Sequence, residues 1–210
     1  MRTSSRLIAL SLTAVTGVLL GAPHAAAAPP NLIRNGWFAD PVAPPDSFVR
    51  VTQGNDEQLA PWSVTDGSTD VYGDALAEYG QNRQALSLNG SGPGAVEQTV
   101  RTESGTTYTL TWSHVRDTWT NPAYDPEDPG SGQPGCQSKP ASEQTYAVGV
   151  SGQRSETRRP ADERGRWEDT SLTFTATGER TTVRFSAAPS DGQDYCGPLI
   201  TGVQVRADAN

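Results

Sequence analysis

The chain has 210 residues, and its 24 acidic and 16 basic side chains give a formal net charge of −8 at pH 7. Such an acidic chain is a poor ligand for nucleic-acid phosphates and for anionic membranes, because both repel it. A highly charged acidic polymer is equally unsuited unless arginine side chains cluster locally. We therefore expect neither a nucleic acid nor a membrane as a partner.

The first 27 residues have the pattern of a secretory signal peptide. Arg2 and Arg6 supply a basic start, residues 7–20 form an apolar run, and Ala27 ends a small-residue cleavage site. The apolar run, about 14 residues long, is shorter than the roughly 20 that a membrane-spanning helix needs. Cleavage after Ala27 removes two arginines and no acidic residue, which changes the net charge from −8 to −10. We predict that residues 28–210 form a single secreted, extracellular domain.

The first part of the mature chain predicts short strands separated by loops. Residues 31–38 are expected to form a short strand that an Asn-Gly turn breaks, and residues 41–46 a loop. Apolar segments follow at 59–64 and 71–72. Residues 74–83 are polar with scattered Ala and Leu, which permits one helical turn but no sustained amphipathic helix.

Residues 84–114 carry the clearest periodicity. Tyr108, Leu110 and Trp112 fall at period two between Thr and Ser residues, so their side chains point to one face of a strand. Turn residues divide the segment into three stretches. We interpret them as three consecutive antiparallel strands with one polar face. The apolar face of such a sheet requires a second layer to cover it.

Alternating patterns return in the second half of the chain. Strands are expected at 145–150, 167–175, 181–185 and 199–205, and the charged residues 154–166 at an edge or in a loop. No segment predicts a long helix. About ten short strands with turn signals between them indicate an all-β fold, specifically a β-sandwich.

Residues 116–142 are rich in Pro and Gly and nearly devoid of aliphatic side chains. A loop of this length within a domain is usually either functional or disordered. Cys136 lies in it, and Cys196 is the second of the two cysteines in the chain. Pairing is the default in an oxidising compartment, and the bridge would close a loop of about 60 residues, worth roughly 4 kcal/mol. Two unpaired thiols are the alternative, and two cysteines with one mature histidine give no zinc-ligand spacing.

Several segments in this order resemble a known family. They are Asn31-Leu32-Ile33-Arg34-Asn35-Gly36-Trp37-Phe38, Pro61-Trp62-Ser63-Val64, Val71-Tyr72, Gln84-Ala85-Leu86-Ser87-Leu88-Asn89-Gly90, Thr107-Tyr108-Thr109-Leu110, Trp167, Phe174-Thr175-Ala176-Thr177-Gly178 and Cys196-Gly197-Pro198. Over nearly the whole mature chain they resemble the domain-of-unknown-function 642 family of plant cell walls and its bacterial relatives, the choice-of-anchor C domains. The resemblance implies a galactose-binding-like jelly-roll β-sandwich of two antiparallel sheets, an extracellular location, association with cell-wall polysaccharide, and no established catalytic residues. It also implies the Cys136–Cys196 disulfide, because both cysteines fall where the plant members have theirs.

The sequence departs from the family pattern at three places. Ala39 stands where an acidic residue commonly follows the Asn-Gly-x-Phe motif, and Thr201-Gly202 stands where the last strand commonly has an Asp pair. In related carbohydrate-binding jelly rolls, acidic groups there help to hold a structural calcium, so we expect no cofactor unless Asp40 substitutes by a shift in register. Trp37 replaces a small or polar residue, and it is either exposed for binding or packed against the N-terminal strand.

A protein that binds sugars needs exposed aromatic faces for the C–H faces of the rings and polar groups for the hydroxyls. The best candidate cluster for carbohydrate binding is Trp112, His114, Arg116, Asp117, Trp119 and Tyr124. The first three share one face of a strand by period two, and the others lead into the long loop. Two interpretations stay open for Trp112, which continues the apolar face of Tyr108 and Leu110, and for His114, which may equally be an edge histidine bonded to water.

No reaction centre stands out. A Ser-His-Asp triad would have to use His114, and no serine lies in a nucleophile-elbow pattern. The acidic residues allow many carboxylate pairs, but nothing singles out one of them. The sequence therefore predicts a secreted, non-catalytic protein that binds cell-wall polysaccharide. A secreted protein–protein interaction or adhesion module and a glycan hydrolase are the alternatives, and the glycan and the oligomeric state stay open.

Overall fold

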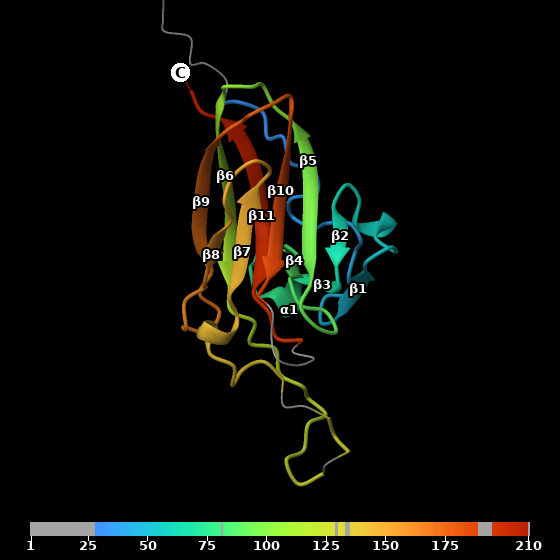
Figure 1. The fold of residues 1–210 in the computed structure, drawn as a ribbon. Helices are drawn as coiled ribbons and strands as arrows, with labels where there is room; N and C mark the ends of the chain where they lie inside the picture. Colours follow the sequence, from blue (N-terminus) through green and yellow to red (C-terminus); the bar gives the residue numbers. More distant parts are fainter. Residues whose placement is uncertain (1–27, 81, 129, 133–134, 189–194, 210) are drawn as a thin grey trace, which may run out of the picture.

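The computed structural model describes residues 28–80, 82–128, 130–132, 135–188 and 195–209, which form two antiparallel sheets packed face to face (Figure 1). One sheet has the strand order β1-β3-β4-β11-β6-β9 and the other β2-β5-β10-β7-β8. The strands are β1 (Phe48–Thr52), β2 (Ser63–Asp66), β3 (Ser68–Tyr72), β4 (Ala85–Ser87), β5 (Ala95–Arg101), β6 (Thr107–Val115), β7 (Tyr146–Val150), β8 (Glu156–Arg158), β9 (Glu168–Thr175), β10 (Arg180–Ala187) and β11 (Leu199–Ala207). Three single turns of helix complete the elements: η1 (Glu57–Leu59), α1 (Asp74–Ala77) and η2 (Ala141–Glu143). The fold is therefore the predicted jelly-roll β-sandwich, and no helix in these described ranges has the length and apolar character to cross a membrane.

The core lies between the two sheets and follows from the period-two patterns. In β6 the side chains of Tyr108, Leu110 and Trp112 are buried while the threonines between them face outward. From the opposite sheet, Val183 and Phe185 of β10 point to the same interior. Strands β9 and β10 and the first part of β6 thus bury alternate side chains, which confirms the faces predicted for them, whereas β3 and β4 are buried at every position.

The pairing predicted within residues 84–114 is wrong, although all three strands exist. β4 pairs with β3 and β11, β5 pairs with β2 and β10, and β6 pairs with β11 and β9. The chain therefore crosses from one sheet to the other after β4 and again after β5. Crossing places the apolar faces of consecutive strands against each other, so that each covers the other in the core.

The N-terminal segment also differs from the prediction. Residues 31–38 form no strand, because the backbone turns into the left-handed region at Asn35 and Phe38, both with φ of 50°. Backbone hydrogen bonds of Leu32 and Gly36 with β11 hold the segment at the sheet. Strand β1, which follows the predicted loop, was not expected from the sequence, whereas the single helical turn α1 was.

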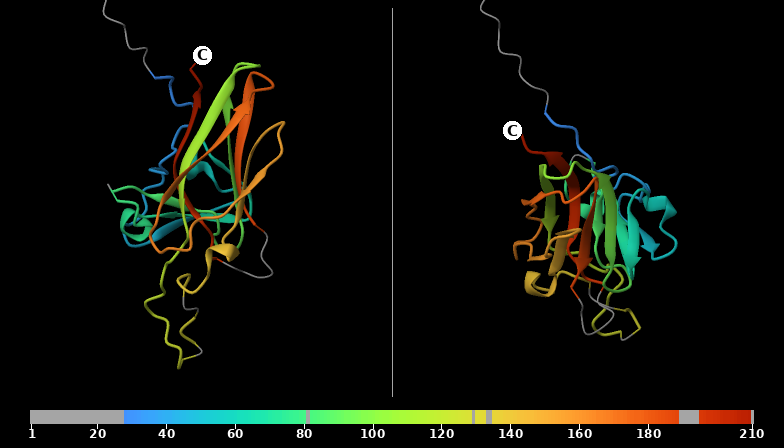
Figure 2. Two further views of the ribbon diagram at one scale, coloured as in Figure 1. Left: turned by 90° about the vertical axis from the view of Figure 1, so that its left-hand side faces the viewer. Right: turned by 45° about the horizontal axis from the view of Figure 1, so that its top comes forward.

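The described residues between β6 and η2 form the predicted long loop, and 120–128 extend from the end of the sandwich opposite the C-terminus (Figure 1, Figure 2). The Cys136–Cys196 disulfide is present, with an S–S distance of 2.11 Å and a Cα–Cα distance of 5.3 Å. It ties the returning end of the loop to the segment before β11. Within the charged residues 154–166, β8 forms the edge of the five-stranded sheet, and the predicted signal peptide lies outside the described residues.

Candidate functional site

The outer face of the six-stranded sheet carries a second, smaller apolar cluster. It consists of Tyr72, Ala77, Ala85, Val115 and Leu199, with Leu76, Trp119 and Trp167 packed against it. The segment that contains α1 and the start of the long loop supply its covering side chains. This covering occupies only part of the outer face, so that grooves remain beside it.

One groove, which we name the Arg50 groove, lies where β1 and β3 meet the long loop. It has a volume of about 270 Å³ and is lined by Phe48, Arg50, Asp70, Tyr72, Trp119, Asn121 and Tyr195. Phe48 and Arg50 are two residues apart in β1 and so share its outer face, opposite Tyr72 and Asp70 in β3. The inward residues of β1 pack on the core, which fixes these two side chains outward.

Aromatic rings form the sides of this groove. The rings of Phe48 and Tyr72 have centroids 6.0 Å apart, and those of Trp119 and Tyr195 meet edge to face, also at 6.0 Å. The guanidinium carbon of Arg50 lies 5.3 Å from the centroid of the Phe48 ring. Exposed ring faces beside a guanidinium group suit a ligand with both apolar and hydroxyl-bearing surfaces.

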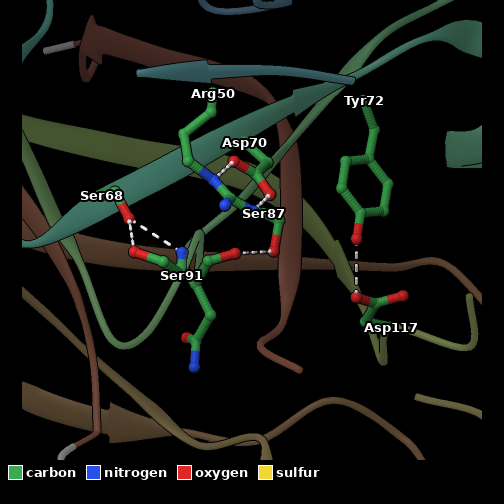
Figure 3. Close-up of polar contacts among 8 residues, drawn as sticks. Arg50, Ser68, Asp70, Tyr72, Ser87, Ser91 and Asp117 are labelled. Atoms are coloured by element: carbon green, nitrogen blue, oxygen red, sulfur yellow. Dashed lines mark hydrogen bonds and ion pairs between the residues drawn. The ribbon is translucent and has the colours of Figure 1, made fainter. Parts of the chain in front are cut away.

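The ion pair between Arg50 and Asp70 forms the polar centre of the groove (Figure 3). Nε and Nη2 of Arg50 each donate a hydrogen bond of 2.8 Å to one carboxylate oxygen of Asp70. Burial raises the pKa of Asp70, which is 3% exposed, and the hydrogen bonds from Arg50 act against that rise. Among the described residues, Nη1 of Arg50 has no hydrogen-bond partner, so it can donate to a ligand.

Asp117 fixes the side chain of Tyr72 and the backbone of Trp119 from behind the groove. Its Oδ2 accepts a hydrogen bond of 3.0 Å from the Tyr72 hydroxyl (Figure 3), and its Oδ1 accepts one of 2.8 Å from the backbone N–H of Trp119. Gln144 holds the backbone of Asp117 through both ends of its side-chain amide. Burial raises the pKa of Asp117 to about 7, although both hydrogen bonds to its carboxyl oppose the rise.

The disulfide brings the two edge-to-face rings together. Cys136 donates its backbone N–H to the carbonyl of Trp119 at 2.6 Å, and Cys196 follows Tyr195 directly. Gly135 has φ of 92°, and a Cβ at this position would lie 2.5 Å from the carbonyl oxygen of Trp119. Only glycine therefore allows the loop to return this closely beside Trp119.

The sequence matches the family described as "Protein of unknown function (DUF642)" over residues 31–206. The chain belongs to this family. None of the curated proteins compared with this DUF642 chain matches it. The relation to choice-of-anchor C domains stays a prediction.

Solved structures show the fold that this DUF642 chain shares with other proteins. The Stig cyclase Fisc from Fischerella sp. TAU is 18% identical, with a TM-score of 0.57 over 86% of this chain and 97% of the cyclase. At this identity the likeness concerns the fold alone. TmCBM61 in complex with β-1,4-galactotriose is 12% identical, with a TM-score of 0.46 over 71% of this chain and 90% of the module. A family 35 carbohydrate binding module from Clostridium thermocellum is 13% identical, with a TM-score of 0.42 over 75% of this chain and 97% of the module.

Three of the six predicted site residues of this DUF642 chain are buried. Trp112 is 2% exposed, donates from Nε1 to the Tyr146 hydroxyl at 2.7 Å, and packs against Phe185 in the core. His114 is 5% exposed and contacts the same hydroxyl through Nδ1 at 2.8 Å, and burial lowers its pKa. Asp117 is 1% exposed behind the groove. The structure thus favours the core interpretation of Trp112, and it buries His114 on the same inner face, so neither the edge position considered for His114 nor an exposed Asp117 is found.

The other three predicted residues lie nearer the surface. Trp119 is half-buried and lines the Arg50 groove, while Tyr124 is exposed in the projecting part of the loop and lines no groove described here. Arg116 donates from Nη1 to the carbonyls of Gln137 and Lys139 and so braces the loop. A role of Trp119 or Tyr124 in binding stays a prediction.

The sequence reasoning missed most of the Arg50 groove. The signal was present in β1, where Phe48 and Arg50 alternate with Val49 and Val51. Such a pattern places a ring and a cation on one face of a strand. Tyr195 has no comparable signal beyond its position next to Cys196.

The positions that the resemblance assigns to calcium do not fit this ion. Ala39 has no oxygen in its side chain, and Thr201 and Gly202 offer one hydroxyl, which donates to a backbone carbonyl. Beside Ala39, the carbonyl oxygens of Phe38 and Pro41 accept hydrogen bonds from the side-chain amide of Gln84. Across the described parts of the chain, no three His, Cys, Asp or Glu side chains are grouped to hold a metal ion.

Proposed function

We propose that this protein is a secreted, non-catalytic carbohydrate-binding protein that associates with cell-wall polysaccharide through the Arg50 groove. One observation carries the proposal: aromatic rings surround the paired Arg50 and Asp70 in a single open groove. Sugar rings have apolar C–H faces and a rim of hydroxyls, so they need both kinds of surface.

The dimensions of the groove favour contact with part of a polymer. Its volume of about 270 Å³ lies just below the roughly 300–1,000 Å³ typical of sites that enclose a drug-sized ligand. Because the groove is open, a chain of sugars can enter at one side and leave at the other. The rings of Phe48 and Trp119 can stack on one sugar unit while Nη1 of Arg50 donates to a hydroxyl.

The carboxylates at the groove support a role in binding without catalysis. Both oxygens of Asp70 accept hydrogen bonds from Arg50, and both oxygens of Asp117 accept hydrogen bonds within the interior. Glycoside cleavage usually needs two carboxyl groups that face the scissile bond from opposite sides. Among the described residues that line the groove, Asp70 is the one carboxylate, and Arg50 engages both of its oxygens.

Binding to a panel of insoluble cell-wall polysaccharides tests the proposal. Trp119→Ala removes one ring of the groove, and we expect about a tenfold loss of affinity, or about 1.4 kcal/mol. Tyr124→Ala removes an exposed ring outside the groove and serves as the matched control, which should bind like the wild type. Equal binding by the wild type and Trp119→Ala would contradict the assignment, and release of reducing sugar from any substrate would favour a glycan hydrolase.

The projecting loop favours a protein partner as the second candidate function. Tyr124 is exposed on it, and exposed tyrosines are common at protein–protein interfaces. Under this alternative the wild type binds no polysaccharide at all. Tyr124→Ala, and not Trp119→Ala, would then weaken capture of an extracellular protein.

A further inference from the structure

A second groove lies on the outer face of the same sheet, over β11, β6 and β9. We name it the Trp37 groove. It has a volume of about 490 Å³, and its lining includes Trp37, Tyr79, Ser113, Asp169, Ser171 and Gln204. It shares no lining residue with the Arg50 groove. Two residues that the sequence singled out, Trp37 and Trp112, belong to its lining.

Connected aromatic rings form one wall of the Trp37 groove. The centroid of the Tyr79 ring lies 5.8 Å from that of Trp37 and 4.8 Å from that of Trp167. The guanidinium carbon of Arg83 lies 4.0 Å from the centroid of the Trp37 ring, which is within the range of a cation–π contact. These contacts restrain the rings before any ligand arrives, so that a ligand orders fewer side chains when it binds.

Gly202 makes room for this wall. It lies at an irregularity of β11 between Thr201 and Gln204, with φ of 64°, and a Cβ there would lie 3.1 Å from two ring carbons of Trp37. The indole therefore takes the space above a residue that has no side chain. Glycine at position 202 and the large Trp37 side chain therefore fit together in a single contact.

Polar groups face the rings across the groove. The Ser113 hydroxyl donates to Oδ1 of Asp169 at 2.6 Å, which leaves Oδ2 without a hydrogen bond among the described residues. Oε1 of Gln204 accepts from Nε of Arg206 at 3.1 Å, and its amide nitrogen has no acceptor in the same part of the structure. One free acceptor and one free donor beside aromatic rings match the hydroxyls of a sugar.

We infer that the Trp37 groove is a second carbohydrate site and that it takes neutral sugar units. Asp169 is the charged residue among the described residues that line it. The guanidinium groups of Arg83 and Arg206 lie outside that lining, where the Trp37 ring and Gln204 engage them. A carboxylate accepts hydrogen bonds from hydroxyls but repels the carboxylate of a uronic acid. The inference rests on the proposed function and extends it, because two grooves on one sheet face let a single polysaccharide bind at two points.

Affinity electrophoresis in gels with soluble polysaccharides tests this inference. The neutral polymers are β-1,4-galactan, xylan and mannan, and the acidic one is polygalacturonate. We expect Asp169→Ala/Gln204→Ala to weaken retardation by a neutral polymer about fivefold while the Arg50 groove is intact, since two-point binding is lost. Adding Trp119→Ala should abolish the remaining retardation. Thr173→Ala, on the same outer face but outside the groove, is the matched control.

The outcomes separate the two proposals. If Asp169→Ala/Gln204→Ala behaves like the wild type while Trp119→Ala loses binding, the second site is refuted and the proposed function stands. If the wild type binds none of the four polymers, both are refuted. If Asp169→Ala weakens binding of polygalacturonate, the assignment to neutral sugars is wrong. Trp37→Ala serves as a further test, with circular dichroism to check that it folds.

Discussion

Replacing Asp117 with Asn should flatten the dependence of folding stability on pH. Asp117 is 1% exposed, and burial raises its pKa to about 7, against an ordinary value of about 3.9. The folded protein therefore holds a proton that the unfolded chain releases between about pH 4 and pH 7. Because the folded state binds more protons in this window, the free energy of unfolding falls as the pH rises through it.

The size of the change in stability follows from the difference between the pKa of Asp117 in the folded protein and its ordinary value. The pKa of Asp117 differs by about three units between the folded and unfolded states, and each unit corresponds to about 1.4 kcal/mol. The free energy of unfolding of the wild type therefore falls by about 4 kcal/mol between about pH 4 and about pH 7. His114 acts in the opposite sense, because burial lowers its pKa and its contribution to stability is lost as the pH falls below its ordinary pKa. Asp117→Asn leaves His114 in place, so the difference between wild type and variant isolates Asp117.

Urea denaturation with the disulfide intact, from about pH 4.5 to about pH 7.5, measures this difference. Asn cannot ionise, so the variant should gain stability relative to the wild type as the pH rises. Asp66→Asn, which removes an exposed carboxylate from β2, controls for the loss of one negative charge. Parallel stability curves for the wild type and Asp117→Asn would refute the reasoning.

Three further predictions concern stability and are checked by the same denaturation assay. Cys136→Ser/Cys196→Ser removes the disulfide between residues with a sequence separation of 60, which should lower the free energy of unfolding by about 4 kcal/mol. An unchanged midpoint of urea denaturation would contradict this. Arg50→Ala leaves the buried Asp70 carboxylate unpaired and should cost about 3 kcal/mol, whereas Arg50→Ala/Asp70→Ala should cost less than the single variant. Gly202→Ala forces a side chain into a left-handed conformation against an indole ring and should cost about 1–2 kcal/mol, and a neutral result would show that the indole moves aside.

The strands could be predicted from the sequence because each carries its own local pattern. Alternation at Tyr108, Leu110 and Trp112 specifies which side chains share a face, and turn residues mark where each strand ends. The disulfide was predictable for a different reason, since the chain has only two cysteines. These features depend on short stretches of chain and on elementary chemistry.

The pairing of β4, β5 and β6 could not be read in the same way. Period two fixes the face of a side chain but not the sheet that a strand joins, because pairing depends on partners far away in the sequence. The same limit bears on whether the side chains of Trp112 and His114 are buried. Trp112 continues the apolar face of Tyr108 and Leu110, so its burial was one of the interpretations of the sequence. The burial of the polar His114 on that face depends on the packing of the second sheet.

The candidate site was predicted in part for a related reason. Trp119 stood out because it lies in a long loop among polar residues. Arg50 and Asp70 are 20 residues apart and belong to different strands, so nothing local joins them. Grooves that form where several segments meet are determined by tertiary structure, and a single sequence shows their parts separately.

The position of β11 between β4 and β6 constrains how the molecule assembles. This strand is the last in the chain, yet it occupies the middle of the six-stranded sheet. During synthesis, the partners on its two sides must wait as separate halves with unpaired edges until residues 199–207 have left the ribosome. Folding of the six-stranded sheet is therefore expected to be slow, as it is for topologies dominated by distant pairings.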